Sequence, residues 1–133
     1  MLITRLFKFS ASHRYYDEAR SPAENWALFG PCSYPNGHGH NYVLEVSVRG
    51  IVDPTTGMII NLKDLKTVVD QEVTQRYDHR HLNLDVDDFA GTQPTTEQVA
   101  VAIWQRLVAK MPIGELARIR LWENDDLYAE VSP

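Results

Sequence analysis

The sequence from His40 to Arg49 alternates between apolar and polar side chains almost without interruption, and this pattern constrains the fold more than any other feature. The apolar members of one face are Tyr42, Leu44, Val46 and Val48. A period of two residues is that of a β-strand with one buried face. A looser alternation from Ile3 to Ala11 predicts another half-buried strand, with His13 at its end.

Two helices are expected to follow these strands. Apolar residues recur at helical spacing over 62–77, and Asn61 is a suitable N-cap for a helix that ends near 75–77. A threonine in the segment 94–97 is expected to cap a second helix, which Pro112 and Gly114 would end. Both helices show one apolar stripe, so each should cover a sheet with one face.

The rest of the chain is predicted to be two loops and a closing hairpin. The stretches 14–39 and 78–93 are rich in turn or polar residues. Ala117–Glu123 and Leu127–Val131 are short apolar runs separated by the turn residues 124–126. The order strand, strand, helix, helix, strand, strand predicts an α+β fold, a four-stranded antiparallel sheet with two helices on one face. Such a small sheet exposes two edges, which favours pairing with another subunit.

The composition excludes several classes of protein. A chain of 133 residues, 44% hydrophobic and 23% charged, predicts one folded domain over residues 1–133. The formal net charge of −5 argues against non-specific nucleic-acid binding. The longest apolar run, Val99–Trp104, is far shorter than the ~20 residues of a membrane span. Cys32 is the single cysteine, which makes the cytoplasm the expected compartment.

Three histidines are expected to meet at the ends of the first two strands. His38 and His40 are two residues apart where the second strand begins, so their side chains can point to the same side. His13 ends the first strand, where an antiparallel neighbour would begin. Three neutral imidazoles leave the fourth position of a tetrahedral zinc open, as in catalytic sites. A His-x-His pair taken alone is also compatible with two solvated or hydrogen-bonded side chains.

Cys32 allows two interpretations. As a fourth ligand it would close the metal site and make the zinc structural. As a free thiol beside the cation it would have its pKa lowered from about 8.5, and the thiolate could act as a base or nucleophile. The turn-rich linker from Ser33 to Gly37 separates it from His38 and is compatible with both.

Polar residues at three further places are candidates for chemistry. Asp78 and His79 are either a solvated pair or a proton relay in which the carboxylate fixes the imidazole tautomer. The segment Thr95-Thr96-Glu97 is most simply a helix start. Glu123 ends a strand, where it either belongs to a solvated turn or accepts the paired N–H donors of a heterocycle.

These motifs together resemble the 6-pyruvoyl-tetrahydropterin synthase family, which includes 6-carboxytetrahydropterin synthases. The shared segments are Phe9–Arg14 (F-S-A-S-H-R), Cys32–Tyr42 (C-S-Y-P-N-G-H-G-H-N-Y), Asp53–Met58 (D-P-T-T-G-M), Asp78-His79, Thr95-Thr96-Glu97 and Glu123. The segments are colinear and cover nearly the whole chain. The match is specific because these separate signals coincide.

The resemblance implies a fold, an assembly and a reaction. The fold would be the tunnelling fold, whose sheets join into a barrel in a homohexamer of two stacked trimers, with active sites at subunit interfaces. The reaction would convert 7,8-dihydroneopterin triphosphate to 6-pyruvoyl-tetrahydropterin with loss of inorganic triphosphate, which is carbon–oxygen lyase chemistry. Zn²⁺ would be bound once per subunit, and Mg²⁺ would accompany the substrate triphosphate.

The resemblance also assigns roles to single residues. The zinc ligands would be His13, His38 and His40. Cys32 would be the general base, with Asp78 and His79 assisting proton transfer from a neighbouring subunit. The substrate-binding residues would be Glu123, as the anchor of the pterin ring, with Thr95, Thr96 and Glu97 lining the pocket.

Two alternatives remain beside this function. The first is the 6-carboxytetrahydropterin synthase of the deazapurine pathway, although five residues between Cys32 and His38 favour the pyruvoyl type. The second is a zinc-binding protein without turnover. One residue departs from the family pattern: His81 stands where a polar residue that does not titrate is expected, so the proton relay would be tuned differently.

Overall fold

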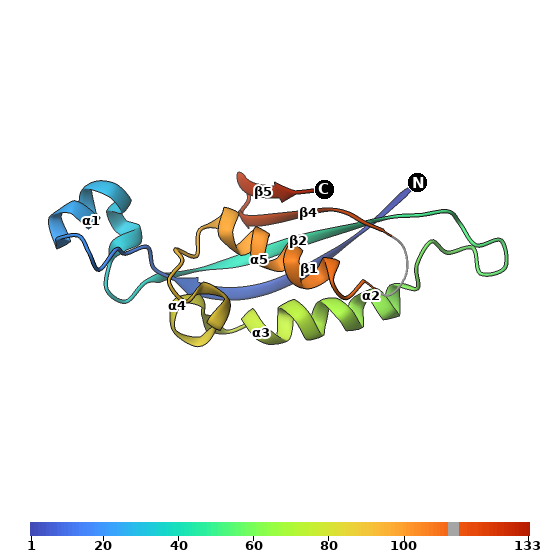
Figure 1. The fold of residues 1–133 in the computed structure, drawn as a ribbon, viewed down its shortest axis with the longest axis horizontal. Helices are drawn as coiled ribbons and strands as arrows, with labels where there is room; N and C mark the ends of the chain where they lie inside the picture. The colour runs from blue at the N-terminus through green and yellow to red at the C-terminus, as the bar shows by residue number, and fades with distance from the viewer. Residues whose placement is uncertain (112–114) are drawn as a thin grey trace.

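The two strands expected from the alternating pattern form the centre of the sheet. The computed structural model describes residues 1–111 and 115–133. Strand β1 (Leu2–His13) pairs antiparallel with β2 (His38–Arg49) along its whole length, from Leu2 opposite Arg49 to His13 opposite His38. Both strands are therefore confirmed, with His13 as the last residue of β1 and His38 as the first of β2. The two strands lie side by side in Figure 1.

The sheet has five strands in the order β3-β1-β2-β4-β5, so the expectation of four antiparallel strands is wrong. Strands β4 (Glu115–Asn124) and β5 (Leu127–Val131) form the expected antiparallel hairpin. The fifth strand, β3 (Arg80–His81), pairs parallel with β1 at Ala11 and Ser12. Two residues are too few to show a period, so the sequence carried no signal for β3.

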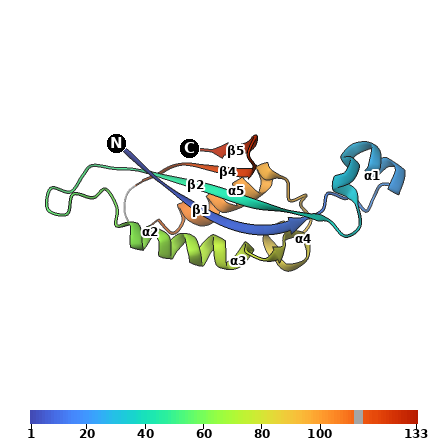
Figure 2. The same cartoon turned by 180° about the vertical axis from the view of Figure 1, so that it is seen from behind.

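Two helical segments pack on one face of the sheet. The first consists of α2 (Leu62–Val69), a π-helical turn η2 (Asp70–Thr74) and α3 (Gln75–Tyr77), and its N-cap is Asn61 as predicted. The second is α5 (Thr96–Val108), capped by Thr95. Pro112 and Gly114, which were expected to end that helix, lie outside the described residues. Helix α5 lies in front of the strands in Figure 1 and behind them in Figure 2, so it covers one face of the sheet.

The core fills the space between this face and the helices. Its fully buried members from the sheet include Tyr42, Leu44, Val46 and Val48, the even-numbered face predicted from the sequence. The helices contribute Leu65, Val69, Val73, Tyr77, Val99, Ile103 and Leu107. Among the helices of residues 1–111 and 115–133, none has both the length and the apolar character to cross a membrane.

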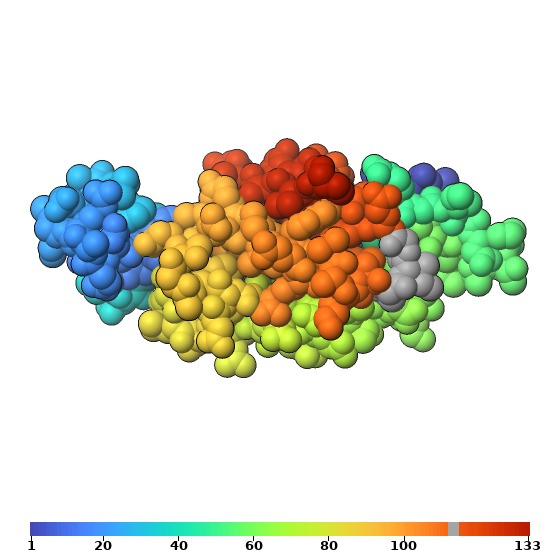
Figure 3. All heavy atoms as spheres, viewed as in Figure 1, coloured from blue at the N-terminus to red at the C-terminus, as the bar shows by residue number. Residues whose placement is uncertain are grey.

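The predicted loop 14–39 contains structure that the sequence analysis missed. Helix α1 (Pro22–Phe29) and a 3₁₀ turn η1 (Gly30–Ser33) form a lobe at one end of the molecule (Figure 3). Ser21 and Glu24 form a capping box at the start of α1. The spacing of serine and glutamate followed by an apolar run is a recognised helix-start signal, so this helix could have been predicted.

The second predicted loop, 78–93, is also partly ordered into short elements. Helix α4 (Leu82–Asp85) and a 3₁₀ turn η3 (Asp87–Phe89) follow β3. Leu82 and Phe89 anchor this segment in the core. The loop therefore packs against the end of β1 that carries His13 and helps to define the surroundings of the histidines.

Candidate active site

Strand register brings the three predicted histidines together. His13 faces His38 across the β1–β2 ladder, and His40 lies two pairs further along, opposite Ala11. The Nε2 atoms of His13 and His38 are 3.1 Å apart. One ring nitrogen from each of the three imidazoles lies within 4.8 Å of the others, a spacing that can hold a metal ion. The side chains lie on the helix-covered face of the sheet, at the end where β1 stops and β2 begins.

The protonation state of the histidines suits a metal. The Nδ1 atom of His13 lies 2.8 Å from the carbonyl oxygen of Pro94, which makes Nδ1 the donor and leaves Nε2 as a free acceptor. Burial lowers the pKa of His13 to about 4 and also lowers the pKa of His40, so both are neutral near pH 7. Within the described ranges, the buried Nε2 of His40 has no hydrogen-bond partner. A set of three imidazoles with such an atom fits Zn²⁺.

Cys32 lies outside the group of three histidines that can share an ion. It is part of η1, and its carbonyl oxygen accepts a hydrogen bond from the Tyr15 N–H at 2.9 Å. The side chain is partly buried, and burial together with the charge of Glu123 raises the pKa of the thiol. From the sequence, a lowered pKa is expected for a thiol beside a cation. The protein groups alone raise the pKa of Cys32, and the positive charge of a bound metal would lower it.

Glu123 and the start of α5 enclose a pocket of about 370 Å³. Glu123 is 9% exposed; its Oε2 accepts a hydrogen bond from the Thr96 hydroxyl, and its Oε1 lies 3.4 Å from His40 Nε2. The pocket is lined by Tyr15, Thr95, Thr96, Glu97, Glu123, Leu127, Tyr128 and Ala129. The four residues expected to bind substrate therefore meet at one pocket, next to the histidines.

Tyr15 is a pocket residue that the sequence analysis missed. Its ring stands edge-on to the ring of His13, with 4.9 Å between the centroids, and burial raises the pKa of its hydroxyl. A tyrosine two residues after a predicted ligand gave no signal in the sequence, because its place depends on how the chain turns after β1.

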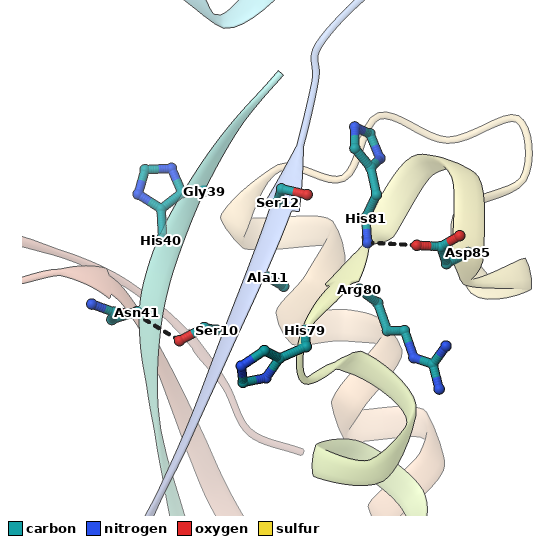
Figure 4. Close-up of a pocket in the computed structure, with 10 residues that line it drawn as sticks. All are labelled: Ser10, Ala11, Ser12, Gly39, His40, Asn41, His79, Arg80, His81 and Asp85. Atoms are coloured by element: carbon teal, nitrogen blue, oxygen red, sulfur yellow. Dashed lines mark hydrogen bonds between the residues drawn. The ribbon is translucent and has the colours of Figure 1, made fainter. Parts of the chain in front are cut away.

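His79, the partner of Asp78, lines a second pocket, of about 540 Å³, together with residues 10–12 of β1 and His40 of β2 (Figure 4). Oδ1 of Asp78 accepts the Ser10 N–H at 2.8 Å, and this bond is the main reason that the pKa of Asp78 is lowered. Oδ2 of Asp78 is 2.9 Å from Nδ1 of His79, whose side chain is 84% exposed. The two side chains are thus paired at the surface, and His79 lines a different pocket from Glu123.

His79 has an unusual backbone conformation that aims its ring. Its φ is 60°, the one positive value at a non-glycine position among the described residues. Its N–H donates to the Ser10 carbonyl oxygen at 2.6 Å. Non-glycine residues in the left-handed region cost about 1–3 kcal/mol and concentrate at functional sites. Figure 4 shows the His79 and His81 rings pointing in different directions.

Comparison with known proteins agrees with this geometry. A model of the family described as 6-pyruvoyl tetrahydropterin synthase matches residues 2–133. Proteins named 6-pyruvoyl tetrahydrobiopterin synthase from Pongo abelii and Homo sapiens are 48% and 47% identical to the chain over 124 residues, which is 93% of this chain and 86% of each relative. The chain belongs to this family.

A solved structure of the synthase family shows the same fold. The 6-pyruvoyl tetrahydropterin synthase of Caenorhabditis elegans superimposes with a TM-score of 0.93 at 38% identity, covering all of this chain and 95% of the other. The chain thus has the α+β tunnelling fold of the synthase family. The five-stranded mixed sheet described above replaces the four-stranded one that the sequence predicted.

The turn before His38 in this chain requires a glycine at position 37. Gly37 has φ of 69°, and a Cβ atom there would lie 2.6 Å from the carbonyl oxygen of His13. Only glycine fits, which explains the Asn36-Gly37 pair in the motif. The Nε2 atom of His81 would lie 3.2 Å from that Cβ, so His81 packs on the turn and away from the Asp78–His79 pair.

Proposed function

We propose that the chain converts 7,8-dihydroneopterin triphosphate to 6-pyruvoyl-tetrahydropterin with elimination of inorganic triphosphate, as a carbon–oxygen lyase. The single observation that carries this proposal is the position of the histidine group directly beside the Glu123 pocket, with 3.4 Å between His40 Nε2 and Glu123 Oε1. A metal at the histidines and a ring held by Glu123 would be neighbours. The family membership supports the same reaction.

In this proposal His13, His38 and His40 hold one Zn²⁺ per subunit. The Pro94 carbonyl keeps His13 in the tautomer whose Nε2 is free. Bound zinc would polarise the hydroxyl oxygens of the substrate side chain and so acidify the adjacent C–H. Mg²⁺ would accompany the substrate triphosphate, whose charge it partly neutralises.

Cys32 acts as the general base and takes a proton from the side chain of the substrate. Its place is supported by the Tyr15–Cys32 hydrogen bond, which ties η1 to the segment after His13. Asp78 holds His79 through Nδ1, so the other ring nitrogen is free to accept or return a proton.

Glu123 accepts the N–H and amino donors of the pterin ring. A buried carboxylate that is already oriented by the Thr96 hydroxyl suits a planar pair of donors. Thr95, Thr96 and Glu97 line the same pocket and fix the orientation of the ring. Tyr15 covers the side of the pocket that faces His13.

The working unit in this proposal is a homohexamer of two stacked trimers whose sheets join into barrels. Within one chain, His79 and Glu123 line different pockets, which supports a site completed by a neighbouring subunit. The chain would act as a single domain over residues 1–133. One cysteine in the role of a base suits the reducing cytoplasm.

The test is the reaction itself. The zinc-loaded protein is incubated with 7,8-dihydroneopterin triphosphate and Mg²⁺, and triphosphate release and the mass of the pterin product are measured. We expect stoichiometric triphosphate and the pyruvoyl product. Cys32→Ala should keep zinc yet lose about a hundred- to ten-thousand-fold in kcat, the usual effect of removing a general base.

The same assay separates the alternatives. A 6-carboxy product would move the protein to the deazapurine branch and leave the zinc and Cys32 assignments intact. An absence of turnover in a zinc-loaded oligomer would favour a zinc-binding protein without catalysis.

A further inference from the structure

Each of the three backbone N–H groups that follow β1 has a defined partner. The Arg14 N–H donates to Oδ1 of Asn83 at 2.8 Å, and the Tyr16 N–H donates to Oε1 of Gln93 at 2.9 Å. Between them, the Tyr15 N–H donates to the carbonyl oxygen of Cys32 at 2.9 Å. The segment Arg14–Tyr16 is therefore bound by groups from three separate parts of the chain.

Each of the two side-chain amides both accepts a hydrogen bond from the segment and donates one to it. Nδ2 of Asn83 donates to the Arg14 carbonyl at 2.8 Å, and Nε2 of Gln93 donates to the Tyr16 carbonyl at 2.7 Å. Each carboxamide thus satisfies both backbone groups of one residue, as a paired strand does in an antiparallel ladder. The pairing of β3 with β1 ends at Ser12. Beyond that point, the two side-chain amides supply the hydrogen bonds to the backbone of Arg14 and Tyr16.

The segment that they hold lies between the main parts of the site. The Tyr15 ring contacts His13 edge-on and lines the Glu123 pocket. The Tyr15 N–H fixes the backbone of Cys32. Gln93 directly precedes Pro94, whose carbonyl oxygen orients His13. A shift of this segment would therefore move the pocket wall and Cys32 relative to the metal ligands.

We propose that Asn83 and Gln93 are positioning residues, whose carboxamides hold Arg14–Tyr16 so that Tyr15 and Cys32 stay in register with the histidine group. Neither side chain is assigned a contact with the substrate. The inference rests on the proposed function for its catalytic consequence, because a misplacement of about 1 Å in a reacting group can lower a rate about a hundredfold. The placement of Cys32 that it describes does not depend on turnover.

Near-isosteric variants test the hydrogen bonds separately from packing. Asn83→Leu and Gln93→Met keep the side-chain volume and remove both bonds of each amide. Gln105→Met is the matched control, because Gln105 is an exposed amide on α5. We expect kcat to fall about tenfold in each test variant, with KM changed less than about threefold and one zinc retained, and no change in the control.

A second measurement follows Cys32 directly. It is the single cysteine, so the rate of alkylation of the zinc-loaded protein by iodoacetamide reports on its surroundings. We expect this rate to rise at least about fivefold in both test variants and to stay constant in Gln105→Met, because loosening the segment weakens the Tyr15–Cys32 bond. Gln93→Glu keeps the acceptor for the Tyr16 N–H and should be intermediate.

The outcomes separate this inference from the proposed function. A lower melting temperature with unchanged kcat and unchanged alkylation would show a merely structural role and overturn it. If Gln93→Met does not fold, an alkylation rate in Gln93→Glu equal to that of the unaltered protein would overturn it as well. Faster alkylation in the variants of a protein that does not turn over the pterin would support the positioning role while the proposed function fails.

Discussion

At the scale of single residues, the surroundings of each histidine set its exposure and the hydrogen-bond partner of one of its ring nitrogens. His13 is fully buried and neutral, and the Pro94 carbonyl decides which of its nitrogens is free. His79 is almost fully exposed and is oriented by Asp78 instead. In the proposed function, the same residue type would be a metal ligand in one place and a proton carrier in another. Burial and the partner on the second nitrogen make the difference.

The first prediction concerns the metal. His38→Ala or His40→Ala should reduce bound zinc from about one ion per chain to less than about a tenth, because two imidazoles do not hold a tetrahedral zinc tightly. Elemental analysis of the purified variants measures this. His79→Ala is the control and should keep its zinc, since His79 lies outside the three-histidine group. Loss of zinc in Cys32→Ala would instead make Cys32 a fourth ligand.

The second prediction concerns recognition of the ring. Glu123→Gln should raise KM by roughly thirtyfold and change kcat less, because a charge-assisted hydrogen bond contributes about 2 kcal/mol. Steady-state kinetics with the pterin triphosphate would show this. Glu115→Gln, on the exposed end of the same strand, should leave both constants unchanged. An effect on kcat alone would assign Glu123 to proton transfer.

At the scale of elements, one polar cluster fastens α5 to the segments beside it. Both oxygens of Asp88 accept hydrogen bonds from the Arg106 guanidinium, with 2.6 Å between Arg106 Nε and Oδ2. The Tyr77 hydroxyl also donates to Oδ2, at 2.5 Å, and Glu72 pairs with Arg106 at 3.4 Å. The cluster joins four elements at the edge of the core. Its carboxylates are less than a fifth exposed, so solvent screens them little.

The third prediction is a pH dependence from this cluster. The Arg106 hydrogen bonds hold the pKa of Asp88 below its usual value. A carboxylate with a depressed pKa in the folded state adds stability above its unfolded pKa, about 3.9, and this stability is lost as the pH falls through the lower folded pKa. Asp88→Asn should therefore lower the free energy of unfolding by about 2 kcal/mol at pH 7, with a difference that shrinks below about pH 4.

Urea titrations over a pH series measure this difference. Asp87→Asn is the matched control, because Asp87 is the exposed neighbour. A deficit in Asp88→Asn that stays constant down to pH 2 would mean that packing, and not charge, sets the effect.

At the scale of the whole molecule, the candidate groups are divided between two pockets. Glu123 lines one pocket and His79 lines the other, which also takes in His40 of the histidine group (Figure 4). The face of the sheet opposite the helices carries polar and aromatic side chains, among them Trp122, whose Nε1 donates to Glu45 at 3.1 Å. Within one chain, His79 and Glu123 therefore line different pockets.

The fourth prediction follows from this division. When inactive Cys32→Ala and His79→Ala proteins are refolded together in equal amounts, about a quarter of the sites should combine an intact Cys32 with an intact His79 of another subunit. Activity should return to about that fraction. A mixture of Cys32→Ala with Glu123→Ala should stay inactive, because both residues belong to the same side of the site. A fully active monomer in light scattering would contradict the shared site.

The sequence by itself determined β1, β2, both main helices and the closing hairpin, because period and capping residues are local signals. It also determined the histidine group, since strand ends place His13 and His38 opposite each other. Only the tertiary structure decided the pairing of β3, the place of Tyr15 and the backbone hydrogen bonds of Asn83 and Gln93. The physical reason is that these features are contacts between residues far apart in the chain, such as Tyr16 with Gln93, and no local pattern records them.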